Sequence, residues 1–223
     1  MRKNGLELRV LLSLAALVVV AGALALVTIG SSSGAKAQRS KALARHFEAA
    51  AAHFDATGVL QPPAPAPPIA LHNYLGQRVS LADYRGKAVL VTFLYTNCPD
   101  ICPLITSDLR VAQNLMSAAT RSKLQIIAVS VDPHGDTRRA VAAFLARHGM
   151  TGRMLYLTGS ARELSRVWQA WGVGSSRDSS QPQFVNHTGI VYGITASGKR
   201  LTLYDPEFKP AEIAHDVPLL ESR

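Results

Sequence analysis

Cysteine is scarce in this sequence: Cys98 and Cys102 are the only two among its 223 residues. A closed structural zinc site usually takes four ligands, so the cysteines cannot build one by themselves. Internal repeats and a complete dinucleotide-binding fingerprint are also lacking. The net charge is +9, but the basic residues are scattered and not clustered on one face with aromatic residues between them. This pattern argues against a nucleic-acid-binding protein.

An uncharged apolar run from Val10 to Ile29 is present near the start of the chain. Its length is enough to cross a membrane as a helix. Basic side chains in residues 1–9 predict that this short segment stays in the cytoplasm while the rest is exported. The alternative is a signal peptide cleaved near Ala35–Ala37, which has the small-x-small pattern. We favour a single-pass membrane protein whose functional domain lies on the extracytoplasmic side.

The segment after this anchor, residues 30–68, is interpreted as a juxtamembrane segment and a Pro-rich linker. Its last part, residues 61–68, is predicted to be a semi-rigid polyproline spacer. The folded domain is therefore expected to comprise residues 69–223.

Within that domain strands and helices alternate, which predicts an α/β fold. A first hairpin is expected before three buried strands that are linked through helices, and such strands run parallel with right-handed crossovers. A second hairpin and a last helix follow. The order indicates a thioredoxin-like fold. The expected strands are 69–74, 78–81, 87–95, 124–131, 154–157, 188–194 and 200–204, and the expected helices are 103–119, 137–148, 161–171 and 210–220.

The two cysteines follow the strand 87–95 and precede a helix expected to begin at Pro103. In α/β sheets, chemistry collects at the carboxyl ends of strands. Cys102 is expected at the helix cap, where the helix dipole favours the thiolate. A purely structural disulfide would close a three-residue loop and stabilise little. We therefore interpret Cys98 and Cys102 as a reactive pair, for dithiol redox chemistry or metal binding.

Histidine is the residue type that separates these two chemistries. In a thioredoxin-like fold the loop before the strand 188–194 faces the cysteine pair, which makes His187 the first candidate ligand and His134 the second. Two thiolates and one imidazole favour Cu(I), with zinc as the main competitor. Asp100 could add an oxygen ligand for zinc.

Three ordered motifs resemble those of the Sco (SenC) family of copper chaperones. They are the sequence from Phe93 to Pro103, the sequence from Ser130 to Pro133 together with Asp136-Thr137, and the sequence from Val185 to Thr188. The resemblance implies a thioredoxin-like fold that binds a copper ion and assists assembly of the dinuclear copper centre of cytochrome c oxidase.

Carried over to this sequence, the resemblance implies that Cys98, Cys102 and His187 are the copper ligands and that Asp132 supports them. The implied partner is the copper-site subunit of cytochrome c oxidase, with other copper or thiol–disulfide proteins as further partners. The sequence departs from the family at Asn186, where an aspartate is usual, and at Phe184, where a tyrosine is common. Both departures concern the surroundings of His187 more than the ligands.

Two other functions compete with copper delivery or reduction of the client's cysteines. The first is an extracytoplasmic thiol–disulfide oxidoreductase or thiol peroxidase. Against it, the cysteine spacer has three residues where a thioredoxin-type reductase has two. The second is a copper or redox sensor, which these motifs do not distinguish from a chaperone.

Overall fold

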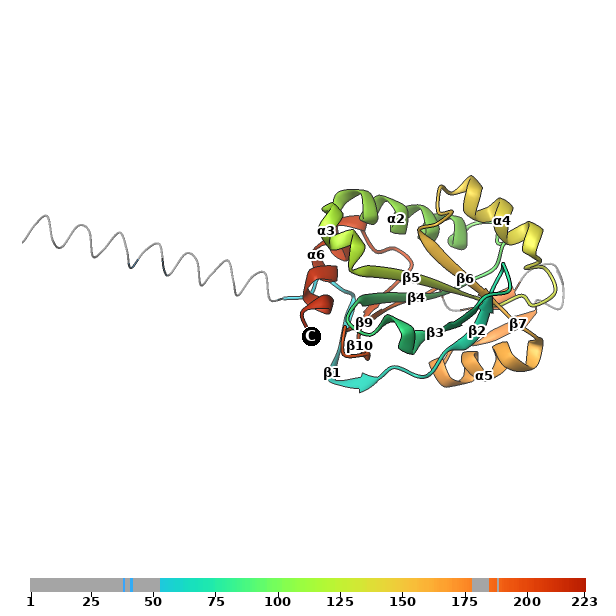
Figure 1. The fold of residues 1–223 in the computed structure, drawn as a ribbon, viewed down its shortest axis with the longest axis horizontal. Helices are drawn as coiled ribbons and strands as arrows, with labels where there is room; N and C mark the ends of the chain where they lie inside the picture. Colours follow the sequence, from blue (N-terminus) through green and yellow to red (C-terminus); the bar gives the residue numbers. More distant parts are fainter. Residues whose placement is uncertain (1–37, 39–40, 42–52, 178–184, 188) are drawn as a thin grey trace, which may run out of the picture. The chain divides into compact units, whose positions relative to one another are not determined.

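The computed structural model describes residues 38, 41, 53–177, 185–187 and 189–223 (Figure 1). Residues 54–223 form one compact unit. The predicted anchor, residues 10–29, lies outside the described residues. Among the helices of the described part, none is both long and apolar enough to cross a membrane.

The main sheet of this unit has eight strands in the order β1-β10-β9-β4-β5-β6-β2-β3. The pairs β4–β5 and β5–β6 are parallel, and all other neighbouring pairs are antiparallel. The strands are β1 (Gly58–Pro65), β2 (Ala70–Asn73), β3 (Arg78–Ser80), β4 (Ala88–Leu94), β5 (Leu124–Ser130), β6 (Met154–Thr158), β9 (Val191–Ile194) and β10 (Lys199–Tyr204). The predicted parallel centre and both hairpins are thereby confirmed.

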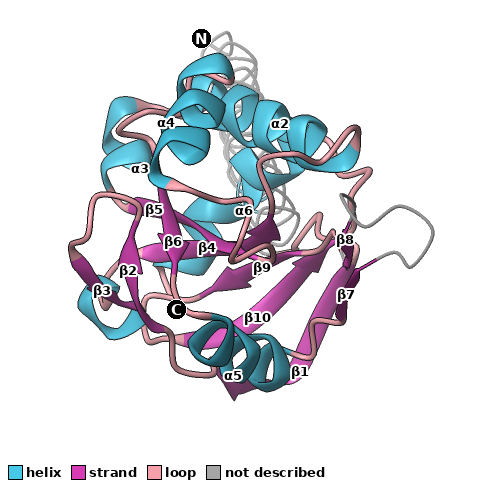
Figure 2. Ribbon diagram, turned by 90° about the vertical axis from the view of Figure 1, so that its right-hand side faces the viewer, coloured by secondary structure: helices cyan, strands magenta, loops and turns pink. Residues whose placement is uncertain are grey.

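Helices cover both faces of this sheet. They are α2 (Ile101–Leu115), α3 (Ala118–Ser122), α4 (Arg138–Arg147), α5 (Ala161–Trp171) and α6 (Pro210–Glu221), with one short 3₁₀ turn, η1 (Leu81–Tyr84). In Figure 2, α2, α3, α4 and α6 lie on one face and α5 lies on the other. The two parallel crossovers run in the same direction along the sheet, so right-handed connections put α2 and α4 on one side.

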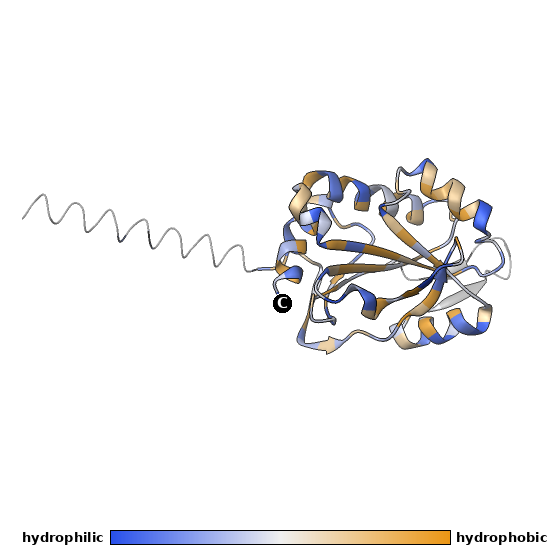
Figure 3. Cartoon of the chain, viewed as in Figure 1, coloured by the Kyte–Doolittle hydropathy of each residue, from blue (hydrophilic) through white to orange (hydrophobic). Residues whose placement is uncertain are grey.

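The core lies between these layers, and β4 is at its centre. All seven residues of β4 are buried, because α2 and α6 cover one face and α5 covers the other. This double coverage explains why β4 has an unbroken apolar sequence in place of an alternating one. Figure 3 shows the same contrast, with apolar strands and polar outer helix surfaces.

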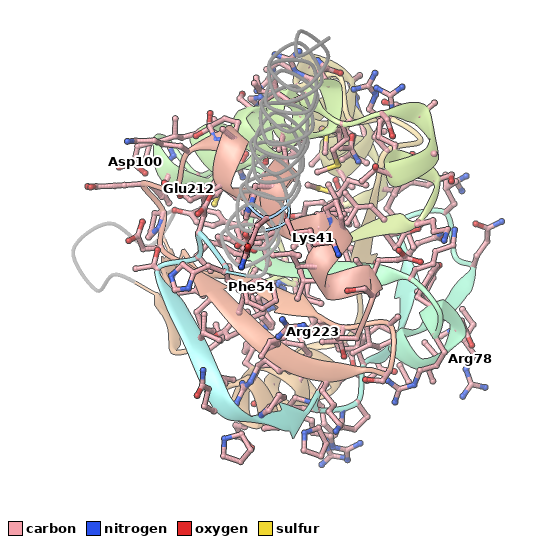
Figure 4. All side chains as sticks on the ribbon, turned by 90° about the vertical axis from the view of Figure 1, so that its left-hand side faces the viewer. Lys41, Phe54, Arg78, Asp100, Glu212 and Arg223 are labelled. Atoms are coloured by element: carbon pink, nitrogen blue, oxygen red, sulfur yellow. The ribbon has the colours of Figure 1, made fainter. Side chains whose placement is uncertain are left out.

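The Pro-rich segment differs from its prediction. Gly58–Pro65 is not a spacer but the edge strand β1, paired antiparallel with β10. Proline lacks an N–H, so it is tolerated at a sheet edge, and the register shifts between Val59 and Ala64. The folded unit accordingly begins at Phe54, whose ring lies 4.8 Å below the guanidinium of Arg223 (Figure 4).

The start of the last expected strand also differs. His187 does not open a long strand, because Val185–His187 forms a separate short strand, β8, that pairs with β7 (Ser175–Arg177). The strand next to β4 begins later, at Val191. The loop predicted before the strand 188–194 therefore includes a two-stranded ribbon, β7–β8.

Candidate metal centre

The cysteine pair lies where β4 ends and α2 begins. Helix α2 starts at Ile101, two residues earlier than predicted, because the Asp100 side chain accepts a hydrogen bond from the Ile101 N–H at 2.6 Å. Asp100 is therefore the N-cap, and Cys102 is the second residue of the helix. Asp100 is labelled in Figure 4. A capping aspartate outcompetes the Pro103 start because it satisfies a helix N–H directly.

The two sulfur-bearing residues are close together and shielded from water. No disulfide joins the two cysteines in the described part of the structure. The Cys102 N–H donates to the Cys98 Sγ over 3.4 Å, and the Cys98 Sγ–H lies 3.6 Å from Asp100 Oδ1. Cys98 is 8% exposed and Cys102 is fully buried. A partner molecule would therefore reach the pair through Cys98.

Burial opposes the Cys102 thiolate that the helix dipole was expected to favour. Burial raises the pKa of the Cys102 thiol far above its ordinary value, and the neighbouring Cys98 raises it further. The backbone N–H group of Cys102, in the first turn of α2, donates its hydrogen bond to the Cys98 sulfur. A metal ion would have to displace the Cys102 proton, because only thiolates bind metals strongly.

Asp132, predicted as a supporting residue, lies in the turn after β5 and is 4% exposed. Its Oδ1 accepts a hydrogen bond from the His134 N–H at 3.3 Å. Its carboxylate also passes very close to Gly135, where an added Cβ would lie 2.2 Å from Oδ2 and 3.4 Å from the Asn97 amide. Gly135 is therefore required for this turn to approach the residue before Cys98.

Asp136 was not among the site residues expected from the sequence. Its carboxylate accepts hydrogen bonds from the Thr96 N–H at 2.8 Å, the Ser130 hydroxyl at 2.6 Å and the Tyr156 hydroxyl at 2.8 Å. It thus joins the segment before Cys98 to the ends of β5 and β6. Burial raises the Asp136 pKa, and these hydrogen bonds oppose that rise. Asp136 also raises the pKa of Tyr156, after burial itself.

The signal for Asp136 was present in the motif that ends in Asp136-Thr137. Asp132 and Asp136 are the same residue type four positions apart. Nothing in the pattern says which of them reaches the cysteine segment, because that depends on how the turn after β5 folds.

The backbone of His187 ends β8, and its side chain is outside the described part of the structure. The next described residue is Gly189. Gly189 is buried, and an added Cβ there would lie 3.1 Å from Pro206, 3.4 Å from Ile101 and 3.4 Å from Ile105. Gly189 therefore packs against the start of α2, whose first turn contains Cys102. That His187 is a ligand stays a prediction.

The second candidate, His134, lies in the same turn as Asp132 and is exposed. A separate group, Asp55, His215 and Asp216, also brings possible metal-ligand atoms within 4.8 Å of one another. Asp216 is already hydrogen-bonded by the N–H groups of Asp55 and Ala56 and by the Tyr204 hydroxyl. We interpret Asp216 as a structural residue whose hydrogen bonds join the start of the folded unit to α6.

The sequence of this unit matches a family model described as SCO1/SenC over residues 60–220. The chain belongs to this family. The human mitochondrial SCO1 homologue is 30% identical over 154 residues, which cover 67% of this chain and 50% of that protein. The chain thus spans about half the length of the curated relatives it matches.

Solved Sco structures have the same fold. ScoI of Bradyrhizobium japonicum, solved with copper bound, is 25% identical with a TM-score of 0.59, and the match covers 70% of this chain and 99% of that one. BsSco is 26% identical with a TM-score of 0.60, covering 72% and 95%. It is described as having a disulfide switch and as a member of the Sco family of cytochrome c oxidase assembly proteins. The predicted thioredoxin-like fold of the Sco family is confirmed.

Proposed function

We propose that this chain is a copper-binding assembly factor of the dinuclear copper centre of cytochrome c oxidase. It delivers copper to that centre or reduces its cysteines. The observation that carries the proposal is the close pair of buried cysteines at the first turn of α2, against which Gly189 packs two residues after His187. Copper in the B. japonicum relative and the oxidase-assembly role of the BsSco family support it.

In this proposal Cys98, Cys102 and His187 hold the copper ion. Two sulfurs and one imidazole nitrogen form a soft donor set of low coordination number, which suits Cu(I). Both cysteines are buried, so water does not compete for the metal. The Asp136 carboxylate keeps the segment before Cys98 in place through the Thr96 N–H. Asp132 shapes the neighbouring turn.

The more exposed cysteine is the one through which copper or a disulfide is exchanged with a partner. Cys98 is the sulfur that a thiolate of the copper-site subunit can reach, while Cys102 lies behind it. The same order supports thiol–disulfide exchange as a second activity, with Cys98 attacking or being attacked and Cys102 resolving the mixed disulfide. In the cell, we propose that residues 10–29 anchor the chain and that the folded unit works on the extracytoplasmic side.

Replacing His187 with alanine tests the ligand set. Two thiolates remain, so Cu(I) affinity of the reduced protein should fall without being lost, because Cu(I) tolerates two-coordination. Cu(II) prefers nitrogen ligands, and its binding with the thiolate charge-transfer absorption should disappear. The Cys98–Cys102 disulfide should still form. Competition with a chromophoric Cu(I) chelator and absorption spectra measure these effects.

The exposed His72 on β2 offers a matched control, and His72→Ala should bind both ions as the parent does. If His187→Ala also binds both ions unchanged, the ligand assignment is wrong, and His134→Ala becomes the variant to measure. A protein that is solely a thiol oxidoreductase would instead show altered thiol exchange rates in His187→Ala and no copper site in the parent.

A further inference from the structure

A cavity of about 500 Å³ lies at the amino ends of the parallel strands, whereas the cysteines lie at their carboxyl ends. It opens where β5 and β6 begin, whereas Cys98 follows the end of β4, which runs parallel to β5. Its walls come from the β2–β3 turn, the last turns of α2, and the segments before β5 and β6. This cavity is thus remote from the proposed copper site, and copper binding does not explain it.

Two arginines in this wall are anchored to the same helix end. Arg121 Nη1 donates to the carbonyl oxygen of Gln113 over 3.2 Å, and Arg153 Nη1 donates to Asn114 Oδ1 over 2.9 Å. Gln113 and Asn114 are consecutive residues of α2, and both arginines are exposed and line the cavity.

These contacts also have an ordinary explanation, because cations near a helix C-terminus stabilise its last carbonyl groups. That role uses one N–H of each guanidinium out of five. Across the described residues, neither Arg121 nor Arg153 forms an ion pair with an acidic side chain. Most of the donor capacity of both groups is therefore available to a ligand in the cavity.

A buried amide in the same wall gives an independent observation. Gln113 is 7% exposed, and its Nε2 donates to the Arg153 carbonyl oxygen at 3.3 Å. Its Oε1 has no hydrogen-bond partner in the described part of the chain. A buried acceptor left unpaired costs about 1–3 kcal/mol. A hydrogen-bond donor in the cavity would recover that cost after a small movement of the side chain.

We propose that this cavity binds a small anionic molecule. Its carboxylate or phosphate group pairs with Arg121 and Arg153, because guanidinium forks recognise such oxyanions in a bidentate manner. Its N–H or O–H group faces the Gln113 amide. The cavity volume falls in the range of sites for small organic ligands and exceeds the need of a single phosphate ion. The site is separate from copper binding and does not depend on it.

Isothermal titration calorimetry of the full-length chain tests the proposal with two probes, citrate and inorganic phosphate, each against sodium chloride of equal ionic strength. We expect saturable binding of at least one probe. Arg121→Gln and Arg153→Gln should each weaken it about tenfold, the usual effect of losing a charge-assisted hydrogen bond. Binding of citrate alone would assign a carboxylate ligand, and binding of phosphate alone would assign a phosphate ligand.

Arg139→Gln is the matched control, because Arg139 is exposed on α4 and does not line the cavity. It should bind the probe as the parent does, and all three variants should load copper normally. Absence of binding by both probes would overturn the proposal. An equal loss in Arg139→Gln would also overturn it, because the binding would then reflect the net positive charge of the protein.

Discussion

Replacing Asp136 with alanine should loosen the segment that leads to Cys98. The Asp136 carboxylate accepts three hydrogen bonds, from the Thr96 N–H, the Ser130 hydroxyl and the Tyr156 hydroxyl, all between 2.6 and 2.8 Å. Asp136 is 5% exposed, so water would not easily replace it as the acceptor. The variant would leave these donors without their acceptor and would free the Thr96 backbone.

The expected loss of unfolding free energy follows from these contacts. A hydrogen bond to a charged group contributes about 1.5–3 kcal/mol, so three of them would exceed about 4 kcal/mol if they were simply added. Removal of the carboxylate also relieves its desolvation, which offsets part of that loss. We expect a net loss of about 3–5 kcal/mol. Domains of this size are stable by about 5–15 kcal/mol, so this loss is a large fraction of the total stability.

The same change should weaken Cu(I) binding by about tenfold. Metal binding would then have to order a residue that is fixed in the parent, and ordering one backbone residue costs about 1–2 kcal/mol. Urea denaturation gives the stability, and competition with a Cu(I) chelator gives the affinity. Asp216→Ala is the matched control, because Asp216 is also buried and hydrogen-bonded by backbone N–H groups and a tyrosine hydroxyl.

None of the hydrogen-bond partners of Asp216 belongs to the cysteine segment. Asp216→Ala should therefore lose comparable stability and keep the Cu(I) affinity of the parent. The reasoning is refuted if Asp136→Ala loses less than about 1 kcal/mol, the value of an ordinary hydrogen bond. It is also refuted if both variants weaken Cu(I) binding equally, because the effect would then report general destabilisation.

Two further predictions concern the ends of the folded unit and its pH dependence. A chain that begins at Phe54 should fold. A chain that begins at Ile69 lacks β1 and the N–H donors to Asp216, so its melting temperature, measured by circular dichroism, should be far lower. Equal melting temperatures would contradict the assignment of β1. Burial raises the Asp136 pKa, so the Asp136 carboxyl keeps its proton to a higher pH in the folded state than in the unfolded state. Its contribution to the free energy of unfolding therefore falls as the pH rises through the folded-state pKa. The parent should therefore lose stability relative to Asp136→Asn as pH rises from about 4 to neutral, and urea titrations that give parallel curves would rule this out.

Much of the fold could be predicted from local sequence patterns. Strands β4 and β5 are apolar and rich in β-branched residues, and helix α5 matches its predicted bounds with Gly172 at φ 68° after its last turn. These elements are easy to predict because a buried strand and a helix end each leave a pattern in a short run of consecutive residues. The Pro-rich strand β1 was missed because its pairing with β10 joins residues far apart in the chain.

The sequence by itself predicts which residues form the candidate site. Two cysteines four positions apart after a buried strand, together with three ordered motifs, are sufficient to predict a Sco-type pair. Sequence could not say that Asp100 caps α2 and so places Cys102 inside the helix. That choice depends on which of two competing helix starts is better hydrogen-bonded.

The tertiary structure alone decided how the pair is held and how it is protonated. The Cys102 thiol pKa rises because the layers around α2 bury the sulfur, an effect opposite to the one expected from the helix end. Asp136, not a residue next to a cysteine, anchors the segment before Cys98, because the turn after β5 folds toward β6. Residue types and spacing are local properties that the sequence carries directly. Burial and long-range hydrogen bonds arise only when distant segments pack together, and they set the reactivity of this site.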